Sequence, residues 1–216
     1  YRMTPRAILF DLDGTLIDQF QAIHRAFSLT MEKMGFHPPS FETVKKAVGG
    51  ASISTMSKLI GPERADEAVN ILRPIFEEEM LNGLVMLPGA KEILLELKKC
   101  GIKSAVLTNK YGPHARAVCQ HLGLDEFLEF TLGANDTEWK KPNLKLTQFA
   151  LDKIKSTAED TIYIGDSPYD YQTAQNASMD YFLVTTGTHS EEELSRLGDN
   201  IKIKPNLLSI LPRLIP

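Results

Sequence analysis

The strongest constraint on this chain is a pair of aspartates that directly follows its first apolar run. Residues 7–10 are Ala-Ile-Leu-Phe, and Asp11, Leu12, Asp13 and Gly14 come next. An apolar run that passes into acids and a glycine is typical of a buried strand entering a tight turn. Both carboxylates then leave the carboxyl end of the strand, which is where ligands bind in an open parallel sheet. Two acids so close together are unfavourable unless a cation offsets their charge.

The second half of the chain alternates strand and helix patterns. Such alternation predicts an α/β fold, a Rossmann-like parallel sheet with helices on both faces and right-handed crossovers. The C-terminal residues predict a short closing helix with a loose end. The predicted strands are 102–107, 128–132, 161–165 and 181–184, and the predicted helices between them are 113–122, 144–154 and 169–178.

Residues 18–85 interrupt this alternation, because all their patterns are helical and no strand pattern occurs among them. We therefore expect a small all-helical cap domain over 18–85, inserted after the first strand, and a catalytic core formed by 1–17 and 86–216. A chain of 216 residues can bury one substantial core and a second small one. The helical patterns in the insert cover 18–34, 41–48, 52–59 and 62–81.

Composition narrows the range of partners. The formal net charge of −4 gives no global attraction to nucleic acid or to an anionic membrane. The sequence contains neither an apolar stretch of about 18–20 residues, as a membrane helix requires, nor an apolar signal segment, so we expect a cytoplasmic location. Cys100 and Cys119 are expected to be free thiols. Monomer and homodimer both remain open.

Polar residues also follow two later strands of the predicted sheet. Thr108 and Asn109 come directly after one strand, and Asp166 follows another, with Asp170 four residues further on. The carboxyl ends of parallel strands meet at one edge, so these side chains are expected to gather beside Asp11.

A lysine completes the predicted constellation. Lys141 precedes Pro142 in the loop before a helix whose start the proline favours, so its ammonium can reach the same edge. Three or four carboxylates gathered there repel one another unless a hard cation shares their oxygens. Mg²⁺ held by one or two carboxylates and a substrate phosphate suits this set, so the sequence predicts a metal–phosphate site.

These motifs, in this order, resemble the haloacid dehalogenase superfamily of aspartate-nucleophile phosphatases. The helical insert after the first motif resembles the family's α-helical cap. The Asp-Gly-Thr-Leu-Ile-Asp opening and Thr108-Asn109-Lys110 look most like the phosphoglycolate phosphatase-like branch. The four matching motifs are Asp11-Leu12-Asp13-Gly14-Thr15, Thr108-Asn109, Lys141, and Gly165-Asp166-Ser167-Pro168-Tyr169-Asp170.

The resemblance implies a Mg²⁺-dependent phosphatase that hydrolyses a small phosphorylated metabolite through an aspartyl-phosphate. Asp11 is then the nucleophile, and Asp13 first protonates the leaving oxygen and later deprotonates the attacking water. Thr108 and Lys141 belong to the implied catalytic set, and they bind the phosphoryl oxygens together with Asn109. The implied metal ligands are Asp11, the backbone carbonyl of Asp13, and Asp166, with Asp170 as a ligand or an outer anchor.

Other activities fit part of the same pattern. A dehalogenase or phosphonatase of this superfamily normally lacks the second carboxylate, so Asp13 argues against both. A sugar phosphomutase retains that carboxylate and is the closest rival enzyme. A signalling receiver-like module, or a noncatalytic phosphate-binding protein, is the rival from a different class.

Several cap residues have competing interpretations. Gly49 and Gly50 look like a loop that faces the site. Lys45 and Lys46 are candidates for binding an anionic part of the substrate, although a solvated helix face is the favoured explanation for them. The five histidines form no metal-ligand pattern and are expected to have surface or packing roles, His24 being the one to examine.

Overall fold

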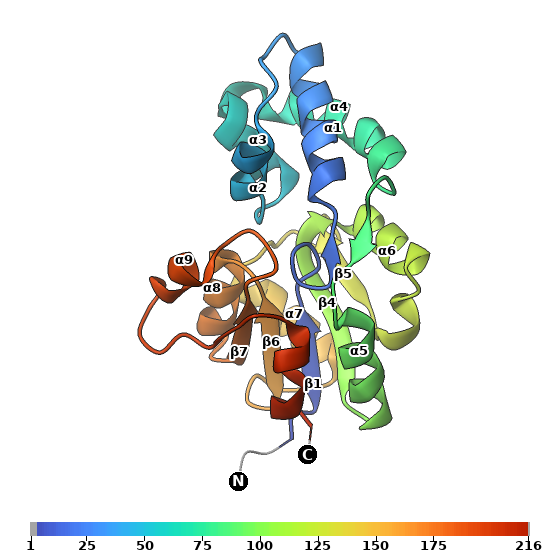
Figure 1. Cartoon of the computed structure of the whole chain (residues 1–216), viewed down its shortest axis with the longest axis vertical. Coiled ribbons are helices and arrows are strands. Elements are labelled where there is room, and N and C mark those ends of the chain that lie inside the picture. The colour runs from blue at the N-terminus through green and yellow to red at the C-terminus, as the bar shows by residue number, and fades with distance from the viewer. Residues whose placement is uncertain (1–3, 216) are drawn as a thin grey trace.

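The computed structural model describes residues 4–215 and contains a six-stranded sheet with helices on both faces (Figure 1). The strand order is β5-β4-β1-β6-β7-β8, and every neighbouring pair is parallel. The predicted parallel α/β sheet is therefore confirmed. Its strands are β1 (Ala7–Phe10), β4 (Lys103–Tyr111), β5 (Thr131–Ala134), β6 (Thr161–Gly165), β7 (Asp180–Val184) and β8 (Ile203–Lys204).

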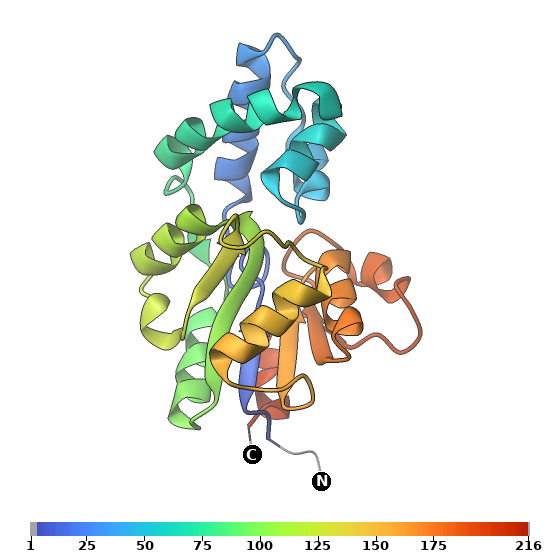
Figure 2. The same cartoon turned by 180° about the vertical axis from the view of Figure 1, so that it is seen from behind.

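Alternate residues of the central strand β1 pack against the two helical layers. Ile8 and Phe10 belong to one hydrophobic cluster, and Ala7 and Leu9 belong to the other. Figure 1 shows the first layer in front of the sheet, and Figure 2 shows the second from behind. The first layer holds α5 (Ala90–Lys99) and α6 (Gly112–His121), and the second holds α7 (Leu144–Ile154), α8 (Pro168–Asn176) and α9 (Glu191–Ser195).

Four helices form a separate bundle above the carboxyl edge of the sheet, which we call the cap (Figure 1). Their apolar faces meet in a third hydrophobic cluster that includes Phe20, Phe27 and Leu72. The all-helical insert is therefore present as expected. The cap helices are α1 (Phe20–Lys33), α2 (Phe41–Ala47), α3 (Ser52–Ile60) and α4 (Ala65–Glu79), with a 3₁₀ turn at Pro62–Arg64.

The insert is bounded by two short strands that the sequence did not indicate. Strands β2 (Ile17–Asp18) and β3 (Val85–Met86) pair antiparallel where the chain leaves the core and returns to it. A strand of two residues is too short to show the alternation of apolar and polar residues that indicates a strand. The sequence around β2 and β3 therefore shows only helical patterns.

Several element boundaries also differ from the sequence prediction. Strand β4 continues through Thr108 and Asn109 to Tyr111, so these residues lie within the strand and not after it. Helix α7 begins at Leu144, where the Asn143 side chain accepts from the Lys145 N–H, so Pro142 does not start it. In place of the expected closing helix the structure has two 3₁₀ turns, Leu207–Ser209 and Leu211–Arg213. Pro212 lies within the second turn, and a proline has no N–H to donate to a longer helix.

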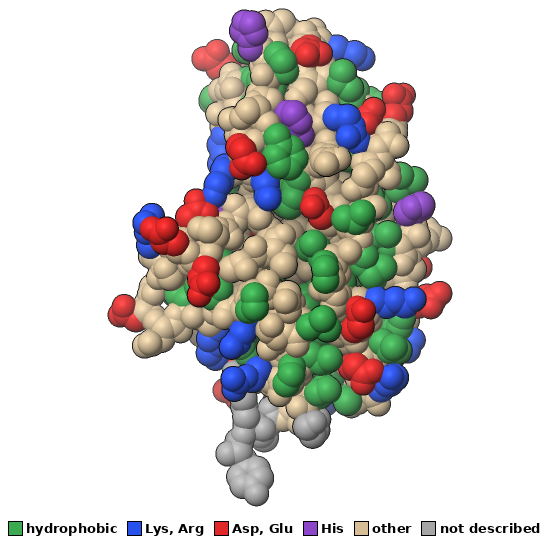
Figure 3. All heavy atoms as spheres, in the orientation of Figure 1, with side chains coloured by type: hydrophobic (Ala, Val, Ile, Leu, Met, Phe, Trp, Pro, Cys, Tyr) green, Lys and Arg blue, Asp and Glu red, His purple; other side chains and the backbone are tan. Residues whose placement is uncertain are grey.

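The distribution of charged side chains on the surface is consistent with the small net charge of the chain. Figure 3 shows acidic and basic side chains interspersed over this face. Within residues 4–215, no helix is both long and apolar enough to cross a bilayer. Cys100 and Cys119 are free, as expected.

Candidate active site

The turn after β1 projects both opening acids from the carboxyl edge of the sheet. The Asp11 N–H donates to the carbonyl of Ile164 in β6, and the Leu12 carbonyl accepts the N–H of Leu16 at 3.0 Å. Gly14 has φ +84°, and a Cβ at this position would lie 2.6 Å from Oδ2 of Asp166. Only glycine meets both the conformational and the steric requirement, which explains its place in the motif.

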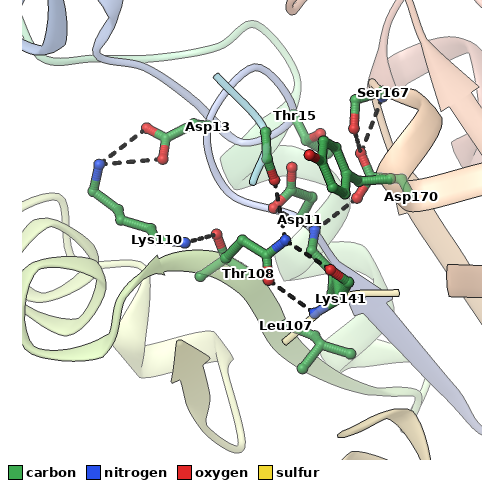
Figure 4. Close-up of polar contacts among 12 residues, drawn as sticks. Asp11, Asp13, Thr15, Leu107, Thr108, Lys110, Lys141, Ser167 and Asp170 are labelled. Carbon is green, nitrogen blue, oxygen red and sulfur yellow. Dashed lines mark hydrogen bonds and ion pairs between the residues drawn. The ribbon is translucent and has the colours of Figure 1, made fainter. Parts of the chain in front are cut away.

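Lys141 connects the first aspartate with the fourth motif (Figure 4). Its Nζ lies 3.0 Å from Oδ1 of Asp11, 2.7 Å from Oδ1 of Asp170 and 2.9 Å from the hydroxyl oxygen of Tyr163. The lysine side chain is only 1% exposed. Burial alone would lower the pKa of Lys141, but the two carboxylates more than offset this effect and raise it well above its usual value. The ammonium therefore stays charged and uses all three of its protons.

Asp170 anchors the loop that carries the fourth motif. Its Oδ2 accepts the backbone N–H groups of Asp166 and Ser167 and the Ser167 hydroxyl, and its Oδ1 accepts from Lys141. Ser167 and Asp170 also form the capping box of α8. The two roles that the sequence suggested for Asp170, helix capping and participation in the site, are thus combined in one buried side chain.

Asp166 is held by the loop after β7, to which no sequence motif assigned a role. Its Oδ2 accepts the N–H and the hydroxyl of Thr188 at 2.8 and 3.1 Å, and Thr15 donates to its Oδ1 at 3.3 Å. A Cβ at Gly187 would lie 1.8 Å from the same carboxylate. The signal was available, because Thr188 lies in the short polar loop that follows the predicted strand 181–184.

The buried acids form a cluster suited to a cation. One carboxylate oxygen from each of Asp11, Asp166 and Asp170 lies within 4.8 Å of the other two. Burial, followed by the charge of Asp170, raises the pKa of Asp11 to about 6, and burial with the charges of Asp170 and Asp11 raises that of Asp166 well above its usual value. A hard divalent cation relieves such repulsion, and a donor set made only of oxygens fits Mg²⁺.

Thr108 and Asn109 lie on the extended end of β4, close to Lys141. The Asn109 side chain accepts the Lys141 N–H at 2.9 Å, and its amide donates to the carbonyls of Lys141 and of Gly49 in the cap, each at 3.1 Å. Thr108 is buried and its hydroxyl accepts the Lys110 N–H. Asn109 therefore positions the lysine loop and ties the cap to the core.

Asp13 has a cation of its own. The Nζ of Lys110 lies 3.1 and 3.4 Å from the two carboxylate oxygens of Asp13 and 4.6 Å from the ring centroid of Phe76. Figure 4 shows Lys110 reaching Asp13 on the far side of Asp11 from Lys141. The two acids of the opening motif thus have different partners. No sequence motif assigned a role to Lys110, although its position next to Asn109 was a signal.

A cavity lies between this edge and the cap. Among the predicted site residues, Asp11, Asp13, Thr108, Asn109 and Asp166 line it, whereas Lys141 and Asp170 lie behind its wall. We call Asp11, Lys141, Asp166 and Asp170 the floor. We call the cap side chains of α1 and α4 that line the opposite wall, namely Ile23, Phe27, Leu72, Arg73 and Phe76, the roof.

Of the cap residues that the sequence placed near the site, the two glycines line the cavity and the two lysines do not. Gly49 and Gly50 line the cavity, as expected. Neither cap lysine does, because Lys46 forms an ion pair with Glu193 and Lys45 lies 5.3 Å from the ring centroid of Phe20. Arg73 is the cap cation that lines it, and no motif marked this residue.

Two histidines, His24 and His114, have different surroundings. Nε2 of His24 contacts the Pro39 carbonyl oxygen at 2.8 Å, which supports a packing role in the cap. His114 lines the cavity, although surface or packing roles were expected for all five histidines. Burial lowers the pKa of His114, so its ring is neutral at pH 7.

Comparison with known proteins agrees with this arrangement. The chain is 30% identical to the phosphoglycolate phosphatase of Rhodospirillum rubrum, over 90% of this chain and 85% of that protein. It is 29% identical to the phosphoglycolate phosphatase of Rhodobacter capsulatus, over 84% of each chain. A haloacid dehalogenase-like hydrolase family protein of Streptococcus pneumoniae has the same fold, with a TM-score of 0.86 and 24% identity over 97% of this chain and 98% of that one.

The family assignment rests on nearly the whole catalytic part of the chain. The sequence profile of the haloacid dehalogenase-like hydrolases matches residues 8–184, which span all four motifs and the helical insert. Together with the phosphatase relatives, this match assigns the chain to the phosphoric monoester hydrolases of the group. The chain belongs to the haloacid dehalogenase-like hydrolase family, in its phosphoglycolate phosphatase-like branch.

Proposed function

We propose that this protein is a Mg²⁺-dependent phosphatase that hydrolyses a small phosphomonoester through an aspartyl-phosphate on Asp11. The observation that carries the proposal is the position of the Asp11 carboxylate. It lines the cavity, lies 3.0 Å from the buried Lys141 ammonium, and belongs to the cluster formed with Asp166 and Asp170. A carboxylate held among fixed charges at the base of a cavity is suited to attack a bound phosphoryl group.

The residues around Asp11 are placed to bind the phosphoryl group. Lys141 lies behind the cavity wall with its three protons directed at Asp11, Asp170 and Tyr163, so it offers a bound phosphoryl group a fixed charge that stays at neutral pH. The Thr108 hydroxyl faces the cavity itself. Because the Asn109 side chain is already committed to Lys141 and Gly49, we assign phosphate binding at this position to its backbone N–H. Fixed donors that need no reorganisation stabilise the transition state better than mobile ones.

Asp13 is the proposed acid and base. Its contact with Lys110, and not with Lys141, separates it from the floor and leaves it facing the leaving-group side of the cavity. From there it can donate a proton to the leaving oxygen in the first step and accept one from water in the second.

Asp11 and Asp166 of the floor, together with the backbone carbonyl of Asp13, would hold Mg²⁺. When bound, the ion would neutralise charge on the phosphoryl oxygens and on the floor itself. Asp170 already accepts hydrogen bonds from Lys141, Ser167 and the Asp166 N–H, so its lone pairs are occupied. We therefore propose Asp170 as the outer anchor of the site and not as a direct ligand.

Phosphate release from p-nitrophenyl phosphate tests this function. Turnover should require Mg²⁺ and stop with a chelator, and Asp11→Asn should lower kcat by more than about 1,000-fold. Asp152→Asn, an exposed change on α7, is the matched control and should retain activity.

Three outcomes would contradict the proposal. Full Mg²⁺-dependent turnover by Asp11→Asn would eliminate the nucleophile. Isomerisation of hexose phosphates without release of phosphate would indicate a phosphomutase, and persistent phosphorylation without turnover would indicate a receiver-like module.

A further inference from the structure

The end of β4 that carries Lys110 is irregular. Its register against β5 shifts between Leu107 and Tyr111, so that residues 108–110 stand against the single residue Gly133. A Cβ at Gly133 would lie 2.5 Å from the carbonyl oxygen of Lys110, so a glycine is needed for this close approach. A bulge of this kind re-aims the side chains of its strand. All three side chains of the bulge line the cavity, whereas regular alternation would turn every second one away.

The bulge brings Lys110 to Asp13 in a nearly buried ion pair. The side chains are 8% and 11% exposed, and the ammonium contacts both oxygens of the carboxylate (Figure 4). Among residues 4–215, neither side chain has a second ion-pair partner. The last torsion of an aspartate side chain is soft, so the plane of its carboxylate is defined only by what it contacts. Lys110 is therefore the group that sets the orientation of the Asp13 carboxylate.

Lys110 is itself held from several sides. Its backbone N–H donates to the Thr108 hydroxyl at 3.1 Å, and the ring of Phe76 in the cap covers its ammonium. The His114 ring packs against Phe76 with centroids 5.0 Å apart, and it brings no competing charge because it is neutral. The position of the ammonium is thus fixed independently of the floor, whose lysine is engaged by other acids.

We propose that Lys110 is a positioning residue for proton transfer, which holds the Asp13 carboxyl group so that one of its oxygens faces the leaving oxygen of the substrate. This inference rests on the proposed function. A protonated carboxyl group keeps an oxygen that can accept from an ammonium, so Lys110 can hold Asp13 in both of its protonation states.

The proton balance of the two steps leaves Lys110 unchanged. In the first step the bond from Asp11 to phosphorus forms, the bond to the leaving oxygen breaks, and the proton of Asp13 passes to that oxygen. In the second step water forms the new bond to phosphorus, the bond to Asp11 breaks, and one proton of the water returns to Asp13. Lys110 keeps its three protons throughout and acts only through Asp13.

The dependence of the rate on the leaving group tests this role. Lys110→Met keeps the length of the side chain and removes its charge. With 2-hydroxyethyl phosphate, whose alkoxide needs a proton, kcat/KM should fall by about 10- to 100-fold, as expected for a misplaced acid. With p-nitrophenyl phosphate the loss should be less than about threefold, and with phenyl phosphate it should be intermediate. The ratio of two kcat/KM values does not depend on the fraction of folded enzyme, so a loss of stability alone leaves it unaltered.

A double-mutant cycle shows whether Lys110 acts through Asp13. With 2-hydroxyethyl phosphate, the variant that combines Asp13→Asn with Lys110→Met should be no slower than Asp13→Asn alone. Lys110→Arg retains the charge and should lose less than Lys110→Met. Lys91→Met, an exposed change on α5, is the matched control and should leave all three substrates unaffected.

Inhibition by inorganic phosphate separates this role from phosphate binding. Its inhibition constant should change less than about threefold in Lys110→Met, because Lys110 holds the acid and not the phosphoryl group. Equal losses for the three substrates, additive losses in the double variant, or clearly weaker inhibition by phosphate would each overturn the inference and leave the proposed function intact. Absence of phosphate release from every phosphomonoester by the unaltered protein would refute the proposed function, and this inference with it.

Discussion

The floor and the roof of the cavity are built differently. Lys141 and Asp170 are almost completely buried, and each makes several hydrogen bonds to other side chains or to the backbone. The roof is mainly apolar, and its cation, Arg73, lies over the Tyr111 ring, with no ion pair to an acid found within residues 4–215. One wall has its polar geometry fixed before any ligand arrives, whereas the other offers shape, exclusion of water and a single available charge.

This contrast suggests a division of labour. Fixed charges serve a step that is the same for every phosphomonoester, because the phosphoryl group does not vary. The roof faces the part of the substrate that does vary, and a fold alone does not specify that part. Changes in the floor should therefore affect all substrates alike, and changes in the roof should affect discrimination among them.

Among the changes that compare the two walls, the largest expected effect comes from Asp13, which lies between them. In Asp13→Asn, kcat/KM for 2-hydroxyethyl phosphate should fall by about 100- to 10,000-fold, because its alkoxide needs a proton to leave. For p-nitrophenyl phosphate, kcat/KM should fall less than about tenfold, since p-nitrophenolate leaves without one. Steady-state kinetics with both substrates measures the difference. Equal losses in kcat/KM would show that Asp13 acts through the floor and not as an acid.

The charge of the floor predicts a dependence of stability on pH. The pKa of Asp11 is raised from 3.8 to about 6, so between these values the folded protein binds more protons than the unfolded chain. Stability without metal should therefore fall as pH rises through this window. The thermal midpoint should be lower at pH 7 than at pH 5, and Mg²⁺ should raise it at pH 7 by binding the folded state.

The variant Asp11→Asn isolates this contribution. Other carboxyls, such as Glu193 with its pKa lowered to about 2, act in the opposite direction but are common to both proteins. The fall in thermal midpoint between pH 5 and pH 7 should be smaller in the variant. An identical fall in both proteins would mean that Asp11 does not carry the excess charge of the floor.

The floor was largely predictable from the sequence, and the reason is local. Asp11, Asp166 and Thr108 follow or end apolar runs, so a pattern of a few residues both identifies the strand and places its end at the shared edge. The parallel sheet then brings these ends together without further information. The sequence could not decide whether Asp170 binds the metal directly or only anchors the site. The answer depends on which hydrogen-bond donors reach each oxygen of its carboxylate, and residue spacing does not show this.

The roof and the support beneath the floor were not predictable in the same way. Arg73 sits on an amphipathic helix where no motif distinguishes it from a solvated arginine, and only the path of α4 across the sheet edge brings it to the cavity. Tyr163 lies inside an apolar strand pattern that conceals its hydroxyl. Both depend on tertiary packing, which residue spacing does not encode.

Tyr163→Phe tests how rigidly the floor is held. The hydroxyl accepts from Lys141 and lies 2.9 Å from the Leu107 carbonyl oxygen and 3.1 Å from Oδ1 of Asp170, so its removal releases the ammonium from one of its three partners. We expect kcat to fall about tenfold for carboxylated and neutral substrates alike, with KM nearly constant, since misplacement of a fixed charge weakens transition-state binding. Tyr171→Phe on α8 is the matched control. A lower thermal midpoint with unaltered kcat would limit Tyr163 to a structural role.

The smallest expected effect concerns the link between cap and core. Lys46 on α2 lies 2.5 and 2.6 Å from the carboxylate oxygens of Glu193 on α9, and both side chains are exposed. Exposed ion pairs contribute little, so Lys46→Glu should change kcat/KM less than about threefold at low salt and less still at high salt. The double variant Lys46→Glu with Glu193→Lys should restore the original value, which a double-mutant cycle would measure. Because the hydrogen bond from Asn109 to Gly49 also joins cap and core, the roof should remain seated without the ion pair. If Lys46→Glu lowered kcat/KM by more than Tyr163→Phe does, and equally for every substrate, closure of the cap would limit the phosphoryl-transfer step that all substrates share. The proposed separation between a floor that catalyses and a roof that discriminates among substrates would then be wrong.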